Sequence, residues 1–119
     1  MRPLLSIIVL TGLSVASLQG ADEADLLQPF LKDHCIRCHG PDKQKGDRRF
    51  DTLTGDFTSL EDAEMFQEIL DQLNLGEMPP EDEAQPKPDE LSRVVTHLTR
   101  SLAHARAVSY THLTLPTKA

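Results

Sequence analysis

The chain has 119 residues, a formal net charge of −7, an aromatic content of 4% and no Trp. This length is enough for one small domain with a thin, mainly aliphatic core, so we expect a metal, a disulfide or a cofactor to support it. Because 12 Lys and Arg residues stand against 19 Asp and Glu residues, the charge balance argues against general nucleic-acid binding.

The N-terminal segment has the pattern of an export signal. Arg2 precedes a mostly apolar run from Leu4 to about Ala16, and small residues offer a cleavage site near residue 16 or just before Ala21. The run is too short to span a membrane as a helix. We therefore predict a signal peptide over residues 1–20 and an exported, periplasmic or cell-envelope protein with no stable membrane span after cleavage. An uncleaved interfacial anchor and a buried helix are the alternatives.

The segment that follows predicts a first helix over residues 22–38, ended by Gly40 and Pro41. Apolar residues at helical spacing form one face of this helix: Leu26, Leu27, Phe30 and Leu31. Residues 41–58 are polar and contain two Gly turn points, so they predict a loop.

A second helix is expected from about Leu60 to Asn74. Ser59 is its predicted N-cap, and Gly76 ends it. Its buried stripe, at positions i, i+3, i+4 and i+7, consists of Phe66, Ile69, Leu70 and Leu73.

A third helix is expected to start near Pro88, after a Pro-rich acidic loop over residues 76–88 that cannot be helical. Its apolar face consists of Leu91, Val94, Val95, Leu98 and Leu102. The body of the sequence has no strand-like alternation and no internal repeat. The pattern therefore predicts an all-α domain over residues 21–107, with three main helices and two long loops.

The last residues, 108–119, drop the helical period and carry no acid. They resemble the translated read-through of a sequencing adapter, so we interpret them as a non-native or disordered tail. If the tail is an artefact, the true gene product is longer than this chain.

Residues 35–39 read Cys-Ile-Arg-Cys-His, and the chain has no other Cys. This spacing is the signature of c-type haem attachment. Thiols at i and i+3 on a helix end lie on one face. Cys35 and Cys38 can therefore each add to one vinyl group of a single haem, which brings His39 beneath the iron as an axial ligand.

Three other interpretations of the motif are open. A structural zinc site needs four ligands, but there is no second Cys pair, and His34, His97 and His104 do not form one convincing unit. A thioredoxin-like redox pair is expected in a βαβ context, and a free Cys pair in an exported protein tends to oxidise. The third alternative is a chance match.

A haem iron needs a second axial ligand or a deliberate vacancy. Met78 lies in a Gly-Glu-Met-Pro-Pro loop, which two Pro residues stiffen, so it can hold a Met–iron bond at low entropic cost. Ligation by His and Met raises the reduction potential. Met65 is expected in the core and His97 on the surface or in the core. His34 is expected to face solvent or to bond to the backbone. The alternative for Met78 is an ordinary loop residue tucked under a helix.

A resemblance to the planctomycete-type cytochrome c domain spans about residues 26–102. It is carried by the stretches FLKDHCIRCHGPDKQKGDRRFDTL and ILDQLNLGEMPPEDEAQP. The resemblance implies a small class I-like cytochrome c fold around one covalent haem c. It also implies that Cys35 and Cys38 attach the haem, that His39 is the proximal axial ligand and that Met78 is the distal one.

The resemblance further places the basic loop over residues 45–49 near the haem edge. Lys45, Arg48 and Arg49 are expected either to pair with haem propionates or to face solvent. At Arg48 the sequence departs from the family, which tends to have an apolar residue there. Haem-pocket and interhelix contacts are expected from Phe30, Leu31, Phe66, Ile69, Leu70, Val94, Val95 and Leu98.

With both axial positions filled by protein, the expected function is one-electron transfer rather than catalysis at the iron. The expected partner is an unidentified redox protein, which the acidic stretch from Asp51 to Glu83 can steer if that partner is basic. Two alternatives are open: a haem module of a larger exported enzyme, and a haem sensor or enzyme with an open coordination site. The oligomeric state is left open.

Overall fold

The computed structural model describes residues 26–114, with side chains to residue 111, so the predicted signal peptide lies outside the described part. It contains three α-helices, α1 (Leu27–His34), α2 (Leu60–Leu75) and α3 (Pro88–Thr114), and one short 3-10 helix, η1 (Lys45–Asp47). Within residues 26–114 there is no strand, only an isolated bridge between His39 and Gln44. The all-α prediction with three main helices is confirmed.

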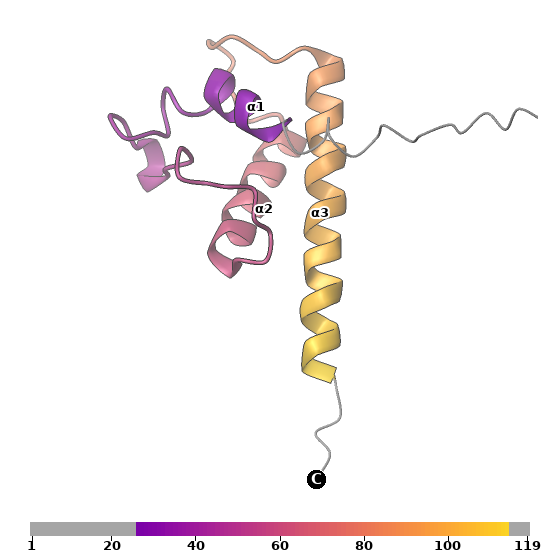
Figure 1. Cartoon of the computed structure of the whole chain (residues 1–119). Helices are drawn as coiled ribbons and strands as arrows, with labels where there is room; N and C mark the ends of the chain where they lie inside the picture. The colour runs from indigo at the N-terminus through magenta and orange to yellow at the C-terminus, as the bar shows by residue number, and fades with distance from the viewer. Residues whose placement is uncertain (1–25, 115–119) are drawn as a thin grey trace, which may run out of the picture.

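The helices are arranged around the N-terminal half of α3. Figure 1 shows α1 and α2 beside this half, while the C-terminal half of α3 extends past both of them. α2 packs directly along α3. The buried residues of α3 are Val94, Leu98 and Leu102, and no side chain from residue 103 to residue 111 is buried. The folded body therefore ends near Leu102, although the helix continues.

The core draws on all three helices, as the apolar stripes predicted. Its buried helical residues are Leu27, Phe30, Leu31, Phe66, Ile69, Leu70, Leu73, Val94, Leu98 and Leu102. Leu91 and Val95 are half-buried at its edge. Phe50 and Leu53 also belong to the core, although they lie in the long loop between α1 and α2. Helical periodicity cannot identify single apolar residues in a loop, so the sequence analysis missed both.

The first helix ends four residues earlier than predicted. α1 stops at His34, because Cys35 has a φ of −123° and thereby leaves the helical region. A separate turn follows, in which the His39 amide donates to the Cys35 carbonyl at 3.0 Å. The Cys-x-x-Cys-His motif therefore lies on its own turn directly after α1.

The ends of α2 match the sequence prediction. The Ser59 hydroxyl accepts from the Asp62 amide at 3.3 Å, as an N-cap does. Gly76 ends the helix in the left-handed conformation, with φ of 70°. The position of Met78 depends on this helix end, because the chain turns at Gly76 into the loop that carries Met78.

Residues 108–114, which the sequence analysis assigned to a non-native or disordered tail, are the last turns of α3. A helix that is already nucleated gains a hydrogen bond for each added residue and needs no buried stripe to continue. In these turns the Thr111 hydroxyl also donates to the Ala107 carbonyl at 2.8 Å. The origin of the segment is a separate question and stays a prediction.

Candidate haem site

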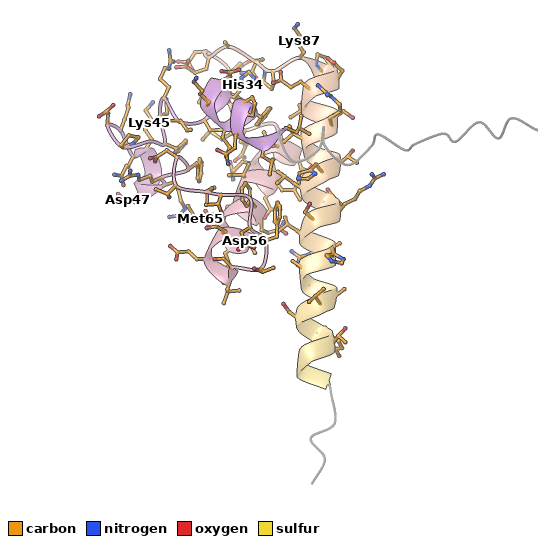
Figure 2. The ribbon with its side chains drawn as sticks, in the orientation of Figure 1. His34, Lys45, Asp47, Asp56, Met65 and Lys87 are labelled. Carbon is orange, nitrogen blue, oxygen red and sulfur yellow. The ribbon has the colours of Figure 1, made fainter. Side chains whose placement is uncertain are left out.

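The turn that carries the two cysteines is fixed by the loop that follows it. The Lys45 amide donates to the Cys38 carbonyl at 2.9 Å, and the Phe50 amide donates to the His39 carbonyl at 2.8 Å. Residues 39–50 therefore fold back over the motif. Within this loop, Lys45 and Asp47 lie on the side of the molecule that is remote from α3 (Figure 2).

His39 is oriented by two contacts from the same loop. Its Nδ1 lies 3.3 Å from the Arg48 carbonyl oxygen, and its ring centroid lies 4.8 Å from that of Phe50. A carbonyl can only accept, so in the neutral ring Nδ1 carries the proton and Nε2 keeps its lone pair. Metal-ligating histidines are commonly held in this way, with the second nitrogen bonded to a carbonyl. The Nε2 atom of His39 is therefore left with a free lone pair.

Gly40 packs against the backbone of Ile36 too closely to leave room for a side chain. A Cβ atom at this position would lie 2.4 Å from the Ile36 carbonyl oxygen and 2.9 Å from Ile36 Cγ2. Its amide donates to the Lys43 carbonyl at 2.8 Å. The sequence analysis treated Gly40 as a helix breaker. The structure shows that a larger residue would also clash with Ile36 at this position.

Met78 lies on the loop that leaves α2, and its side chain is 39% exposed. The Gln85 side-chain amide holds this loop in shape by donating to the carbonyls of Pro79, Pro80 and Glu83 at 3.2, 2.8 and 3.1 Å. The peptide bond between Met78 and Pro79 is cis. The stiffness predicted from the two prolines is thus reinforced by a side chain that the sequence analysis did not consider.

One cleft of about 580 Å³ brings the four predicted site residues together. We call its two sides the motif side, residues 35–50, and the methionine side, residues 68–85. Cys35, Cys38 and His39 line it from the motif side and Met78 from the methionine side. The remaining apolar lining consists of Phe30, Phe50, Ile69, Leu73, Pro79, Pro80 and Ala84. This volume lies in the usual range of small-molecule and cofactor sites, about 300–1,000 Å³.

The apolar walls, paired thiols and free imidazole nitrogen fit a covalently attached haem. A second groove of about 780 Å³ lies between residues 55–58 and the C-terminal half of α3, and neither cysteine nor Met78 lines it. The chemistry predicted from the sequence therefore belongs to the smaller cleft.

The two cysteines form no disulfide with each other in this fold. Burial raises the pKa of the Cys35 thiol to about 12, so this thiol is neutral near pH 7. A redox-active Cys-x-x-Cys pair needs a thiolate with a lowered pKa. The thiol-redox alternative therefore loses support.

The zinc alternative also finds no support in this part of the chain. Among the residues that the structure describes, no group of three or more His, Cys, Asp or Glu side chains could hold a metal ion. This finding does not bear on a haem, because the porphyrin itself would supply four iron ligands and the protein at most two.

Of the other axial candidates, Met65 and His97 do not line the cleft, and His34 lines it but is engaged elsewhere. Met65, on α2 (Figure 2), packs against the core, as predicted. The His97 ring lies 6.1 Å from that of Phe57 and does not line the cleft. His34 does line it, but its Nε2 lies 3.4 Å from Glu90 Oε1 on α3, and its Nδ1 is buried without a hydrogen-bond partner. His34 is therefore an interhelix contact rather than the solvent-facing or backbone-bonded residue that was expected.

The basic residues of the loop have different surroundings. Arg48 pairs with Glu68 of α2, and Arg49 pairs with its neighbour Asp51. Lys45 lines the cleft and has no ion-pair partner within residues 26–111. Of the three predicted propionate partners, Lys45 is thus the cation that remains available at the cleft.

Phe50 is the apolar residue of the cleft, in contact with His39, that sequence reasoning missed. It is buried, lines the cleft and contacts the His39 ring. Its only sequence signal was the isolated apolar pattern Phe50-x-x-Leu53 in a polar loop.

No helix within residues 26–114 is long and apolar enough to cross a membrane.

No curated protein and no solved structure matches the chain. The model of the planctomycete cytochrome c family matches residues 35–82. This match runs from the first cysteine of the motif, through α2, to the loop that follows Met78. Residues 35–82 of this chain are therefore a planctomycete cytochrome c domain.

Proposed function

We propose that this domain transfers single electrons through one haem c that is attached covalently by Cys35 and Cys38, with His39 and Met78 as its axial ligands. The observation that carries the proposal is the single cleft that these four residues share. The chain holds one Cys-x-x-Cys-His motif, which corresponds to one haem.

The residues of the cleft suit electron transfer because they need to move little. A haem held there would supply the chemistry, which is one-electron oxidation and reduction at its iron. His39 is fixed by the Arg48 carbonyl and by Phe50, and Met78 lies on a loop fixed by Gln85. Rigid ligands keep the same geometry in both oxidation states, and an apolar lining with Met ligation favours a higher reduction potential.

Met78 lines the cleft and is 39% exposed. We infer that a redox partner protein approaches there, and that the domain itself is an electron carrier rather than an enzyme. Export to the periplasm or cell envelope agrees with the predicted signal peptide and with the chemistry of haem attachment. The domain can act as a free or tethered carrier or as a module of a longer exported protein.

The proposal is tested by expressing the chain together with a c-type haem maturation system. A haem stain on a denaturing gel should mark the band of the chain, because thioether bonds survive denaturation. The visible spectrum should show a low-spin haem whose ferric form has the weak long-wavelength absorption of a Met–iron bond. Haem that separates from the chain on the gel would contradict covalent attachment, and a high-spin spectrum would contradict the second axial ligand.

A further inference from the structure

Two ion pairs cross the cleft, each from the motif side to the methionine side. Arg37, which lies between the two cysteines, pairs with Glu83, five residues after Met78. Arg48 reaches the Glu68 carboxylate of α2 with Nε at 2.6 Å and Nη2 at 3.2 Å. All four of these residues line the cleft.

These pairs are the whole polar connection between the two sides. Residues 35–50 and residues 68–85 are all described, and no backbone hydrogen bond joins one range to the other. The side-chain hydrogen bonds between them are those of Arg37 with Glu83 and of Arg48 with Glu68. The relative position of the two sides therefore depends on these pairs and on the apolar core behind the cleft.

Each pair is tied closely to one of the predicted axial ligands. The Arg48 carbonyl accepts from His39, while the Arg48 side chain pairs with α2. Glu83 belongs to the loop segment that Gln85 holds together with Pro79, the residue after Met78. A shift in either ion pair is thus transmitted to a ligand through one or two hydrogen bonds.

We propose that the Arg37–Glu83 and Arg48–Glu68 pairs position Met78 over the haem iron and so set how readily the Met78–iron bond opens. Both arginines are positioning residues, since neither touches the iron. This inference rests on the proposed function, because it takes Met78 as the distal ligand.

The expected effect is modest, because the pairs are exposed. The Arg37 side chain is 74% exposed, and the Arg48 and Glu68 side chains are 44% and 47% exposed. Exposed pairs of this kind change an equilibrium by about two- to fivefold each. They are also screened by salt, which gives the test a second readout.

The chain provides a matched control in the pair of Arg49 and Asp51. Arg49 is next to Arg48, is exposed to the same degree at 42%, and also binds a carboxylate with two nitrogens, at 2.7 and 2.9 Å. Its partner is two residues away on the same loop, so the pair does not cross the cleft. Asp51→Asn removes an equivalent ion pair without separating the two sides.

The experiment measures imidazole binding to the ferric haem-loaded full chain, because imidazole occupies the iron only when Met78 leaves it. Glu83→Gln and Glu68→Gln should each raise imidazole affinity by about two- to fivefold, and the double variant should combine the two increases. Asp51→Asn should match the wild type. Raising the salt concentration should increase imidazole affinity in the wild type and in Asp51→Asn, but not in the double variant.

Reversal of one pair, in the variant Arg37→Glu with Glu83→Arg, should return imidazole affinity toward the wild-type value. The inference is overturned if the cleft-crossing variants behave like Asp51→Asn while the wild type retains its Met–iron absorption. A wild type without that absorption would instead overturn the proposed ligation by Met78, and this inference with it.

Discussion

The two sides of the cleft reach the same site by different physical routes. On the motif side, three of the predicted site residues lie within five consecutive positions, and one turn with local backbone hydrogen bonds holds them. On the methionine side, the Met78 loop is held by the end of α2, by the Gln85 side chain of the same loop and by Arg37 from the motif side. The first arrangement is encoded locally, whereas the second depends on how α2 packs against the rest of the fold.

A glycine on each side shows the same difference at the level of one residue. Gly40 on the motif side is needed because the neighbouring turn leaves no room for a Cβ atom. Gly76, just before the Met78 loop, has open space around it but a φ of +70°. Gly40 is therefore required because a Cβ atom would clash, and Gly76 because its φ is positive. The variants below separate the contributions of the two sides.

The largest effect is expected from removing the motif-side thiols. In the double variant Cys35→Ser with Cys38→Ser, no thioether bond can form, so the haem stain on a denaturing gel should disappear completely. Either single variant should keep one bond and a weaker stain. His34→Gln is the control, since His34 is predicted to have no role in attachment, and it should stain like the wild type. A stained double variant would show that the motif does not carry the haem.

The next largest effect is expected on the methionine side, from Met78→Ala. The haem should stay attached, the Met–iron absorption should vanish, carbon monoxide should bind the ferrous form, and the reduction potential should fall because Met ligation raises it. Met65→Leu is the matched control, because Met65 packs on the core and should leave all four readouts unchanged. If the site is instead open, as in a sensor, Met78→Ala should alter neither the spectrum nor ligand binding.

A core substitution should affect both sides together. Leu98 is fully buried between the helices, so Leu98→Ala should lower the free energy of unfolding by about 2–5 kcal/mol. Leu60, which is 74% exposed, is the control, and Leu60→Ala should change stability by less than about 0.5 kcal/mol. Denaturant unfolding followed by haem absorbance and by circular dichroism should give coincident transitions. Separate transitions would mean that the two sides unfold independently.

A smaller effect, confined to the motif side, is expected from Gly40→Ala. The new Cβ would meet the Ile36 carbonyl at 2.4 Å, and relieving this overlap should cost about 1–3 kcal/mol. The motif turn should shift, so the yield of attached haem should also fall, as measured by the ratio of haem to protein. An unchanged yield and stability would show that the turn relaxes without strain.

The smallest effect is expected from Gly76→Ala, since only backbone strain opposes it. Placing Ala in the left-handed region should cost about 1 kcal/mol in the free energy of unfolding. Gly76→Asn should cost less, because Asn tolerates this conformation better. The Met–iron absorption should weaken in Gly76→Ala while the haem yield stays normal. A loss of haem yield instead would link this helix end to the motif side.

Much of the fold followed from periodicity and from helix-end signals. The Phe66 to Leu73 stripe, the Ser59 cap, the Gly76 end and the start of α3 at Pro88 were all predicted and are confirmed. The end of α1 at His34 and the continuation of α3 to Thr114 were not predicted. Both differences concern helix ends where no buried stripe guides the pattern, so the backbone geometry of a few residues decides the outcome.

For this protein, the sequence alone determined the class of chemistry. Two thiols and an imidazole within five consecutive residues indicate haem attachment without further information, because one turn is enough to bring them to the same face. The tertiary structure decided which distant groups join them. It brought Met78, 39 positions after His39, to the same cleft, placed Phe50 against the His39 ring, and paired Arg37 and Arg48 with carboxylates on the opposite side. The Gly-Glu-Met-Pro-Pro motif had already singled out Met78 as an axial candidate. The contacts of Phe50, Arg37 and Arg48 depend on how helices and loops pack, and no short pattern in the sequence encodes them.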